Sequence, residues 1–342
     1  MDKSVESYLL GMELGAPQSF ENMTVFELRT TLDGGPEYIT LKEALEKGVF
    51  TVTEVSEGGS VPELMVANKG DVAVLILDGE ELRGAKQNRV LNTTILVGPK
   101  SATRVPVSCV EHGRWNYVSP DFQESGNVMH REMRARNIFQ VNRSLESERE
   151  FRSNQGEIWD SVARLHCDMQ VPSKTGAMRD VYEAKGADLD GYLKAFKAAD
   201  GTKGILVFID GKPAGMDFIS RSKAFATLFP KLIKSYAMEA IFLAERRKRG
   251  RGKGDADKAL IKPTADEARE FMKRAAACEE KKYESVGMGW SYRYSAPGVV
   301  GSALAIDEKV VHMAFFSVDE GVKAEPTGNM AGSNMRRGFR TV

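Results

Sequence analysis

Strand-like segments stand both before and after a long helical block in this sequence, and this order is the strongest constraint on the fold. Short runs rich in β-branched and aromatic residues extend from about residue 24 to 118 and return after residue 205. Residues 120–200 are instead charged and have helical periodicity. Because no βαβ unit repeats, the order predicts an α+β fold rather than a doubly wound sheet.

The first part of the chain, residues 1–120, is predicted to be β-rich, with a sandwich or barrel-like sheet that carries the candidate site. Asp78-Gly79 follows an apolar run, and both residues tolerate the positive φ of a tight turn, so this pair predicts a β-hairpin. The expected strands cover residues 50–55, 64–67, 72–77, 89–97 and 103–110.

Residues 121–325 are predicted to form an α+β part, either a second domain or one domain intertwined with the first. Asn154, three residues before Glu157, is an N-cap signal for a helix whose apolar residues repeat with helical spacing. Another central helix is expected over 178–197, broken or bent at its two glycines.

A long core helix with Pro230 in it is expected next, and it should end before a basic run, 246–255, that is predicted to be a flexible, solvated loop. Thr264-x-x-Glu267 is a capping box, and the helix that it begins is expected to reach about residue 284.

Hairpin signals mark the C-terminal half of the chain as well. Asp210-Gly211 and Asp307-Glu308-Lys309 each separate two strand-like runs, which predicts antiparallel hairpins packed with the long helices. Residues 326–342 have no periodicity and are expected to form an extended or disordered tail.

The composition excludes several classes of protein. The chain has 48 basic and 48 acidic residues, so its net charge is zero and no global field attracts nucleic acid or an anionic membrane. Its apolar runs are much shorter than the roughly 18 residues of a membrane-spanning helix, and its N-terminus does not resemble a signal peptide. Three cysteines without CxxC spacing fit a reducing compartment. The chain is therefore predicted to be soluble and cytoplasmic.

The common motifs of cofactor and metal chemistry do not occur in this sequence. It has no GxGxxG motif between a strand and a helix, no GxxxxGK[ST] and no GxSxG, which argues against Rossmann, P-loop and α/β-hydrolase chemistry. It also has no HxH, HExxH or CxxC, so no metal site is predicted. The cofactor, if any, is left open.

Polar side chains concentrate in residues 77–89 and 109–115, with strand-like runs between them. Carboxylates and an imidazole can transfer protons, Arg can bind phosphate through two hydrogen bonds, amides both donate and accept, and an indole can stack on a base or sugar. The alternatives are exposed turn carboxylates, a polar surface strand, and a salt-bridged strand end with a half-buried Trp. The catalytic candidates are Glu80, Glu81, Glu111 and His112, and the ligand-binding candidates are Lys86, Gln87, Asn88, Arg89, Arg114 and Trp115.

Two strings, Glu-Glu-Leu-Arg-Gly-Ala-Lys-Gln-Asn-Arg-Val-Leu-Asn-Thr-Thr at 80–94 and Val-Pro-Val-Ser-Cys-Val-Glu-His-Gly-Arg-Trp at 105–115, carry a resemblance to a known family. Most of the chain resembles a prokaryotic family described as ADP-ribosylglycohydrolase and rhodanese-phosphatase superfamily-associated. The resemblance implies a role near ADP-ribose or NAD-derived metabolites, and it implies no particular catalytic residue.

Two hypotheses follow from these residues. In the first, the protein is an enzyme that binds a small phosphate-bearing metabolite, nucleotide-like or derived from ADP-ribose or NAD, and hydrolyses it. In the second, it is a non-catalytic binding or protein-interaction module. Convergence of the two polar strings favours a ligand site, and a carboxylate buried beside that site favours the enzyme. Neither nucleic acid nor a membrane is an expected partner, and the oligomeric state is open.

Overall fold

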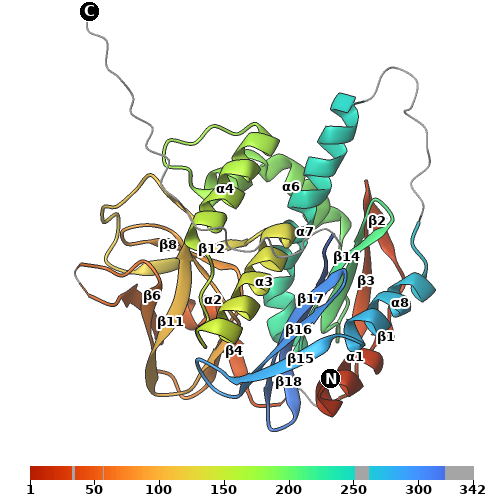
Figure 1. Cartoon of the computed structure of the whole chain (residues 1–342), viewed down its shortest axis with the longest axis horizontal. Helices are drawn as coiled ribbons and strands as arrows, with labels where there is room; N and C mark the ends of the chain where they lie inside the picture. Colours follow the sequence, from red (N-terminus) through yellow and green to blue (C-terminus); the bar gives the residue numbers. More distant parts are fainter. Residues whose placement is uncertain (33–34, 57, 251–261, 320–342) are drawn as a thin grey trace, which may run out of the picture.

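The computed structural model describes residues 1–32, 35–56, 58–250 and 262–319, and it has the α+β architecture that the sequence predicts (Figure 1). A large antiparallel sheet lies on one side of the molecule and a half-barrel of shorter strands on the other. The described helices are α1 (Lys3–Leu10), α2 (Leu41–Glu46), α3 (Arg131–Ser147), α4 (Gln155–Met169), α5 (Met178–Ala184), α6 (Gly186–Ala195), α7 (Ser222–Gly250) and α8 (Ala265–Ala276).

The large sheet has nine strands in the order β1-β3-β13-β14-β18-β17-β16-β15, with β2 paired to β3. β3 pairs with β13, so residues before 120 and residues after 200 contribute to one sheet. The bounds are β1 (Glu13–Leu14), β2 (Gln18–Phe20), β3 (Met23–Arg29), β13 (Gly204–Ile209), β14 (Lys212–Ile219), β15 (Glu279–Glu284), β16 (Trp290–Ala296), β17 (Val299–Ile306) and β18 (Lys309–Ser317).

The half-barrel combines a six-stranded sheet, β12-β8-β9-β11-β6-β5, with a three-stranded sheet, β10-β7-β4. β4 and β7 pair in parallel, while β7 and β10 are antiparallel. The bounds are β4 (Tyr38–Thr40), β5 (Phe50–Glu54), β6 (Glu63–Asn68), β7 (Ala73–Ile76), β8 (Glu80–Gly84), β9 (Arg89–Leu91), β10 (Ile95–Val97), β11 (Ser101–Cys109) and β12 (Phe122–Val128).

Alternating side chains along β13 bury both faces of the large sheet. Ile205 and Val207 belong to a core that also contains residues of α3, α4, α6 and α7. Leu206 and Phe208 belong to a second core, which α1 and α8 cover. A third core fills the half-barrel. This arrangement leaves α7 packed between the large sheet and β12 of the half-barrel (Figure 1).

The hairpin predictions have a mixed outcome. Asp210 and Gly211, at φ 53° and 74°, join β13 to β14, and a turn at residues 307–308 joins β17 to β18, so both C-terminal hairpins are confirmed. Gly79 also has a positive φ, of 73°, but no hairpin forms there. β7 pairs with β4 and β10, whereas β8 pairs with β9 and β12, so the Asp78-Gly79 turn sends the chain from one sheet to another. The chain returns to the first of these sheets after residue 91. The predicted strand at 89–97 is therefore divided into β9, in the six-stranded sheet, and β10, in the three-stranded sheet.

The helix predictions are confirmed at their starts more often than at their ends. The Asn154 side chain accepts the N–H groups of residues 156 and 157 at the start of α4, and the Thr264 capping box begins α8. The predicted helix at 178–197 breaks before Gly186, which separates α5 from α6, but Gly191 lies inside α6.

Two predicted segments in the C-terminal half are wrong in part. The helix expected to reach residue 284 ends at Ala276, because residues 279–284 pair with β16 as the edge strand β15, and this pairing overrides their helical propensity. In the basic run, residues 246–250 continue α7 instead of forming a loop. Residues 251–255 and the predicted tail at 326–342 lie outside the described residues.

Candidate functional site

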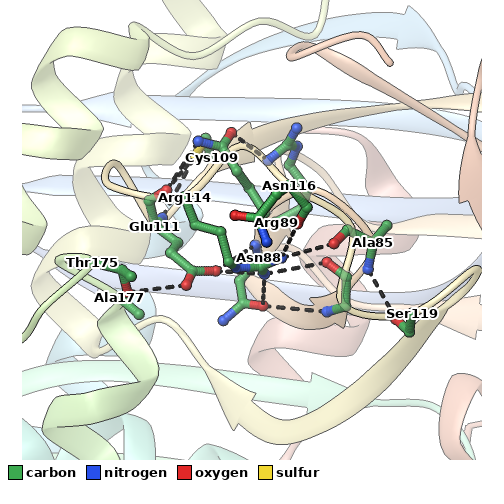
Figure 2. A network of polar contacts seen from close by, with 12 residues as sticks. Ala85, Asn88, Arg89, Cys109, Glu111, Arg114, Asn116, Ser119, Thr175 and Ala177 are labelled. Carbon is green, nitrogen blue, oxygen red and sulfur yellow. Dashed lines mark hydrogen bonds and ion pairs between the residues drawn. The ribbon is translucent and has the colours of Figure 1, made fainter. Parts of the chain in front are cut away.

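Strand pairing brings the two polar strings together. β9 and β11 are antiparallel neighbours in which Arg89 lies opposite Cys109, and the N–H of Val110 donates to the carbonyl of Asn88 at 3.1 Å. The residues just before β9 and just after β11 therefore lie side by side at the end of the half-barrel, where they form one polar network (Figure 2). The convergence that favours a ligand site is present.

Glu111 lies at the centre of this network and holds it together (Figure 2). Its Oε2 accepts hydrogen bonds from Arg114 Nη2 at 2.6 Å and from the N–H of Asn88 at 3.1 Å. Its Oε1 accepts from the Thr175 hydroxyl at 3.0 Å. Gly113 also approaches Thr175, since a Cβ at Gly113 would meet the Thr175 Cα at 2.9 Å. Glu111 thus fixes β11 to the segment that precedes α5.

The Arg114 guanidinium holds the turn between β8 and β9. Nη1 donates to the carbonyls of Ala85 at 2.7 Å and Asn116 at 3.1 Å, and Nη2 donates to Asn88 Oδ1 at 3.2 Å as well as to Glu111. Gln87 donates from Nε2 to the Glu111 carbonyl at 3.0 Å. These polar groups are engaged by the protein itself, so they shape the site.

Arg89 differs from its neighbours because its guanidinium is largely unpartnered. The residue is 0% exposed, and Nη1 donates to Gln87 Oε1 at 2.9 Å. Nε and Nη2 are buried and donate to no acceptor. Within the described ranges no carboxylate forms an ion pair with Arg89, and burial lowers the pKa of its guanidinium. This side chain has binding capacity that the protein leaves unused.

Trp115 lies beside Arg89, and Lys86 lies beside both Trp115 and Tyr117. The Trp115 ring centroid lies 5.7 Å from the Arg89 guanidinium carbon. Lys86 Nζ lies 5.4 Å from the centroid of Trp115 and 5.1 Å from that of Tyr117. Trp115 and Tyr117 are 49% and 48% exposed. Each ring therefore contacts a cation and is about half exposed to solvent.

Glu54, at the end of β5, lies close to Lys86. Both of its carboxylate oxygens are buried, and neither accepts a hydrogen bond. Lys86 Nζ donates to the Gly58 carbonyl at 2.7 Å, and a Cβ at Gly59 would meet Glu54 Oε2 at 3.4 Å and Lys86 Nζ at 3.5 Å. We call Glu54, Lys86, Arg89, Trp115 and Tyr117 the Arg89 site.

Glu80 and Glu81 do not join the Arg89 site. Glu80 Oε1 lies 2.5 Å from Lys231 Nζ of α7, and its Oε2 accepts the N–H of Leu77 at 3.0 Å, so this carboxylate is paired within the core. Glu81 accepts a 3.4 Å hydrogen bond from Asn127 of β12, and burial raises its pKa to about 7. These two carboxylates belong to the contact between β8, β12 and α7.

His112 also lies apart from the Arg89 site. It is exposed, and its imidazole packs edge-on against Trp159 of α4, with the ring centroids 4.4 Å apart. Of the ten predicted site residues, Lys86, Arg89 and Trp115 are in the Arg89 site, and four more surround it as a supporting network, namely Gln87, Asn88, Glu111 and Arg114. Glu54 and Tyr117 were not predicted. The signal for Glu54 is its position at the end of a strand just before Gly58-Gly59.

Two hollows of the molecule lie away from the Arg89 site. One, of about 70 Å³, is lined by residues of α3, α4 and α7, among them His130 and Glu239. The other, of about 440 Å³, lies near the start of α7, beside Tyr38 and Arg221. Among the described residues, no three His, Cys, Asp or Glu side chains are grouped to hold a metal ion.

Fold and site together define an α+β protein in which a half-barrel presents a buried, incompletely paired guanidinium beneath exposed aromatic rings. The chain belongs to the family described as ARG and Rhodanese-Phosphatase-superfamily-associated Protein domain, whose model matches residues 11–316. No curated protein and no solved structure gives a significant match. None of the helices in the described ranges has the length and apolar composition that crossing a bilayer requires.

Proposed function

We propose that this protein binds a small phosphate-bearing, nucleotide-like metabolite in the Arg89 site. The observation that carries the proposal is the fully buried Arg89 guanidinium, whose Nε and Nη2 donate to no acceptor. Each buried donor without a partner costs about 1–3 kcal/mol of folding stability. A phosphate group could accept hydrogen bonds from both nitrogens at once, as arginine–phosphate pairs commonly do.

The two other fully described buried arginines, Arg134 and Arg293, are better paired than Arg89. Arg134 is equally buried, and all three of its guanidinium nitrogens donate to the carboxylates of Asp78 and Asp217. Arg293 has no carboxylate partner in the described chain, but it donates from two nitrogens, to Ser291 and Thr93. Arg89 donates from a single nitrogen, Nη1, to Gln87. Arg293 Nη1 is buried without a partner among the described residues as well, so the difference is one of degree: two nitrogens lack an acceptor at Arg89, one at Arg293 and none at Arg134.

The aromatic rings support a ligand that carries a base. Trp115 and Tyr117 have half-exposed faces beside two cations, and flat aromatic faces of this kind stack on nucleobases. Arg89 is closed off from solvent and Trp115 lies beside its guanidinium, so we expect the Trp115 side chain to move when the ligand phosphate reaches Arg89. Binding would then replace the contact between Trp115 and Arg89 by contacts of both residues with the ligand.

Hydrolysis of the bound ligand is the second candidate function. The observation that favours it is the buried carboxylate of Glu54, which is unpaired within the described chain. A buried carboxylate beside the binding groups is what a hydrolytic enzyme requires as a general base. Glu111 and Glu80 are less suitable, because Arg114 and Lys231 respectively pair with them. Three free cysteines, Cys109, Cys167 and Cys278, support the proposed cytoplasmic location of this activity.

A thermal-shift and calorimetric titration tests the proposal with ADP-ribose, NAD, AMP and inorganic phosphate. Wild type should gain apparent stability with at least one nucleotide, by about 2.7 kcal/mol at a ligand concentration of 100 Kd. Arg89→Met should lose this gain. Arg83→Met, an exposed position of β8, is the matched control and should retain it. If no ligand binds wild type, or Arg89→Met binds as tightly, the proposal is wrong and the exposed rings become candidates for a protein-interaction surface.

A further inference from the structure

Two groups with opposite requirements lie together in the Arg89 site. Glu54 has two buried oxygens that accept no hydrogen bond, and Arg89 has two buried nitrogens that donate none. Four buried polar atoms without partners in one place are costly, because each loses its contacts with water and gains nothing from the protein. A ligand that supplied the missing partners would remove this cost.

Glu54 and Arg89 do not satisfy each other. The Glu54 carboxylate is close enough for its charge to favour the charged form of Arg89, yet no ion pair within 4.0 Å joins them in the part of the chain that the structure describes. Gln87 and Trp115 contact the Arg89 guanidinium. Glu54 lies beside Gly59 and Lys86. A carboxylate and a guanidinium that served only stability would close into a bidentate pair.

The partner atoms that these groups need define a ligand. A carboxylate with two free oxygens can accept from two neighbouring hydroxyl groups, which is how acidic residues bind the ribose of dinucleotides. A guanidinium with two free donors can bind an anion. Resting on the proposed function, we propose that the Arg89 site recognises a ribose phosphate, with Arg89 donating to the phosphate and Glu54 accepting from the vicinal 2′ and 3′ hydroxyls.

A zwitterion is the main alternative to a ribose phosphate as the ligand. An amino acid could also offer an anion to Arg89 and a donor to Glu54. It would lack a base, however, whereas Trp115 and Tyr117 offer half-exposed aromatic faces beside Lys86 on which a nucleobase can stack.

Isothermal titration calorimetry with paired ligands tests the assignment of Glu54. The probes are AMP and 2′-deoxy-AMP, with ribose 5-phosphate and 2-deoxyribose 5-phosphate as a pair without the base, and serine as the zwitterion. Wild type should bind each ribose ligand about 10- to 100-fold more tightly than its deoxy form, which corresponds to the loss of a hydrogen bond to a charged group. Glu54→Gln should reduce this ratio to near one while it retains binding of the deoxy ligands.

Glu63→Gln, a half-exposed position on the neighbouring strand β6, is the matched control and should keep the full preference for ribose. Arg89→Met should lose all the phosphate ligands. Equal wild-type affinity for ribose and deoxyribose ligands, with binding that still depends on Arg89, would overturn the role of Glu54 and leave the anion site standing. Tighter binding of serine than of AMP would also overturn it. No binding of any phosphate ligand would instead refute the proposed function.

Turnover of the ligand separates the two roles of Glu54. If Glu54→Gln keeps the ribose preference but loses hydrolysis of a bound nucleotide, Glu54 is a general base and the recognition role is wrong. If it loses the ribose preference and binds the deoxy ligands unchanged, Glu54 is a recognition residue. Melting temperatures of all variants establish that they fold.

Discussion

The Arg134 guanidinium donates to both carboxylate oxygens of Asp217, at 2.6 and 3.0 Å, and both side chains are completely buried. It also contacts Asp78, from the turn that follows β7. Arg134 lies on α3 and Asp217 on β14, so this cluster connects the half-barrel to the large sheet through the central helix layer. The guanidinium keeps the pKa of both carboxyl groups below the usual range.

Replacement of Arg134 by methionine should strongly destabilise the protein. The substitution leaves Asp78 and Asp217 buried without their cation, and removing one partner of a buried ion pair costs about 3–5 kcal/mol. Urea unfolding followed by circular dichroism should show this loss as a lower transition midpoint with a similar slope. A loss below 1 kcal/mol would contradict the structural role assigned to this cluster.

Replacement of Arg89 by methionine, in contrast, should leave the stability of the protein unchanged or increase it. Arg89 has no carboxylate partner in the described chain and two buried donors without acceptors, so the substitution removes a cost that the folded protein bears. The free energy of unfolding should stay within about 1 kcal/mol of wild type or increase. The same urea titration measures both variants. If Arg89→Met and Arg134→Met lose stability equally, Arg89 is a structural arginine.

The buried carboxyl group of Glu81 should make stability depend on pH near neutrality. Burial raises its pKa from 4.5 to about 7 in the folded protein, so the folded state holds this proton over a pH range in which the unfolded chain has released it. Stability therefore falls as pH rises from about 4.5 to 7, by up to about 3 kcal/mol. Glu81→Gln should remove this slope and be the more stable protein at pH 8.

Unfolding free energies at pH 5, 6, 7 and 8 check this prediction. His130 contributes in the opposite direction, because burial lowers its pKa to about 4 and its contribution is lost as pH falls below 6.5. At each pH, the difference in unfolding free energy between wild type and Glu81→Gln isolates the contribution of Glu81 from that of His130. A difference that does not change between pH 5 and 8 would show that Glu81 titrates like an exposed carboxyl group.

Local signals in the sequence predict the local elements of this fold. The caps at Asn154 and Thr264 depend on side chains three residues from the groups that they bind, and the turn at Asp210-Gly211 depends on the φ preferences of two adjacent residues. Pairing between distant strands has no such signal. Asp78-Gly79 has the same turn chemistry as Asp210-Gly211, but the strands around it pair with other strands, and Asp78 forms an ion pair with Arg134 of α3.

The candidate site shows the same limit. The segments around Arg89 and Glu111 could be placed together because each adjoins a predicted strand of one sheet. Glu54 could not, since it lies 35 positions before Arg89 and reaches the site only through the order of strands in the half-barrel. Glu80 was a candidate because its sequence neighbours are polar. Its partner Lys231 lies 151 residues away, so the sequence did not reveal that this carboxylate is paired.

The three cysteines should differ in reactivity with a thiol reagent under native conditions. Cys167 is exposed on α4, whereas Cys109 and Cys278 are buried, and burial raises the pKa of the Cys278 thiol to about 11. Cys109 is also fixed in β11, because the Gln155 side chain binds both its N–H and its carbonyl, each at 2.8 Å. Titration with a chromogenic disulfide should therefore give one fast equivalent, which Cys167→Ser removes, and two slow equivalents that appear only as the protein opens or unfolds. Fast labelling of Cys109 in the Cys167→Ser variant would show that the β9–β11 strand pair, in which Cys109 lies opposite Arg89, opens to solvent even in the absence of ligand.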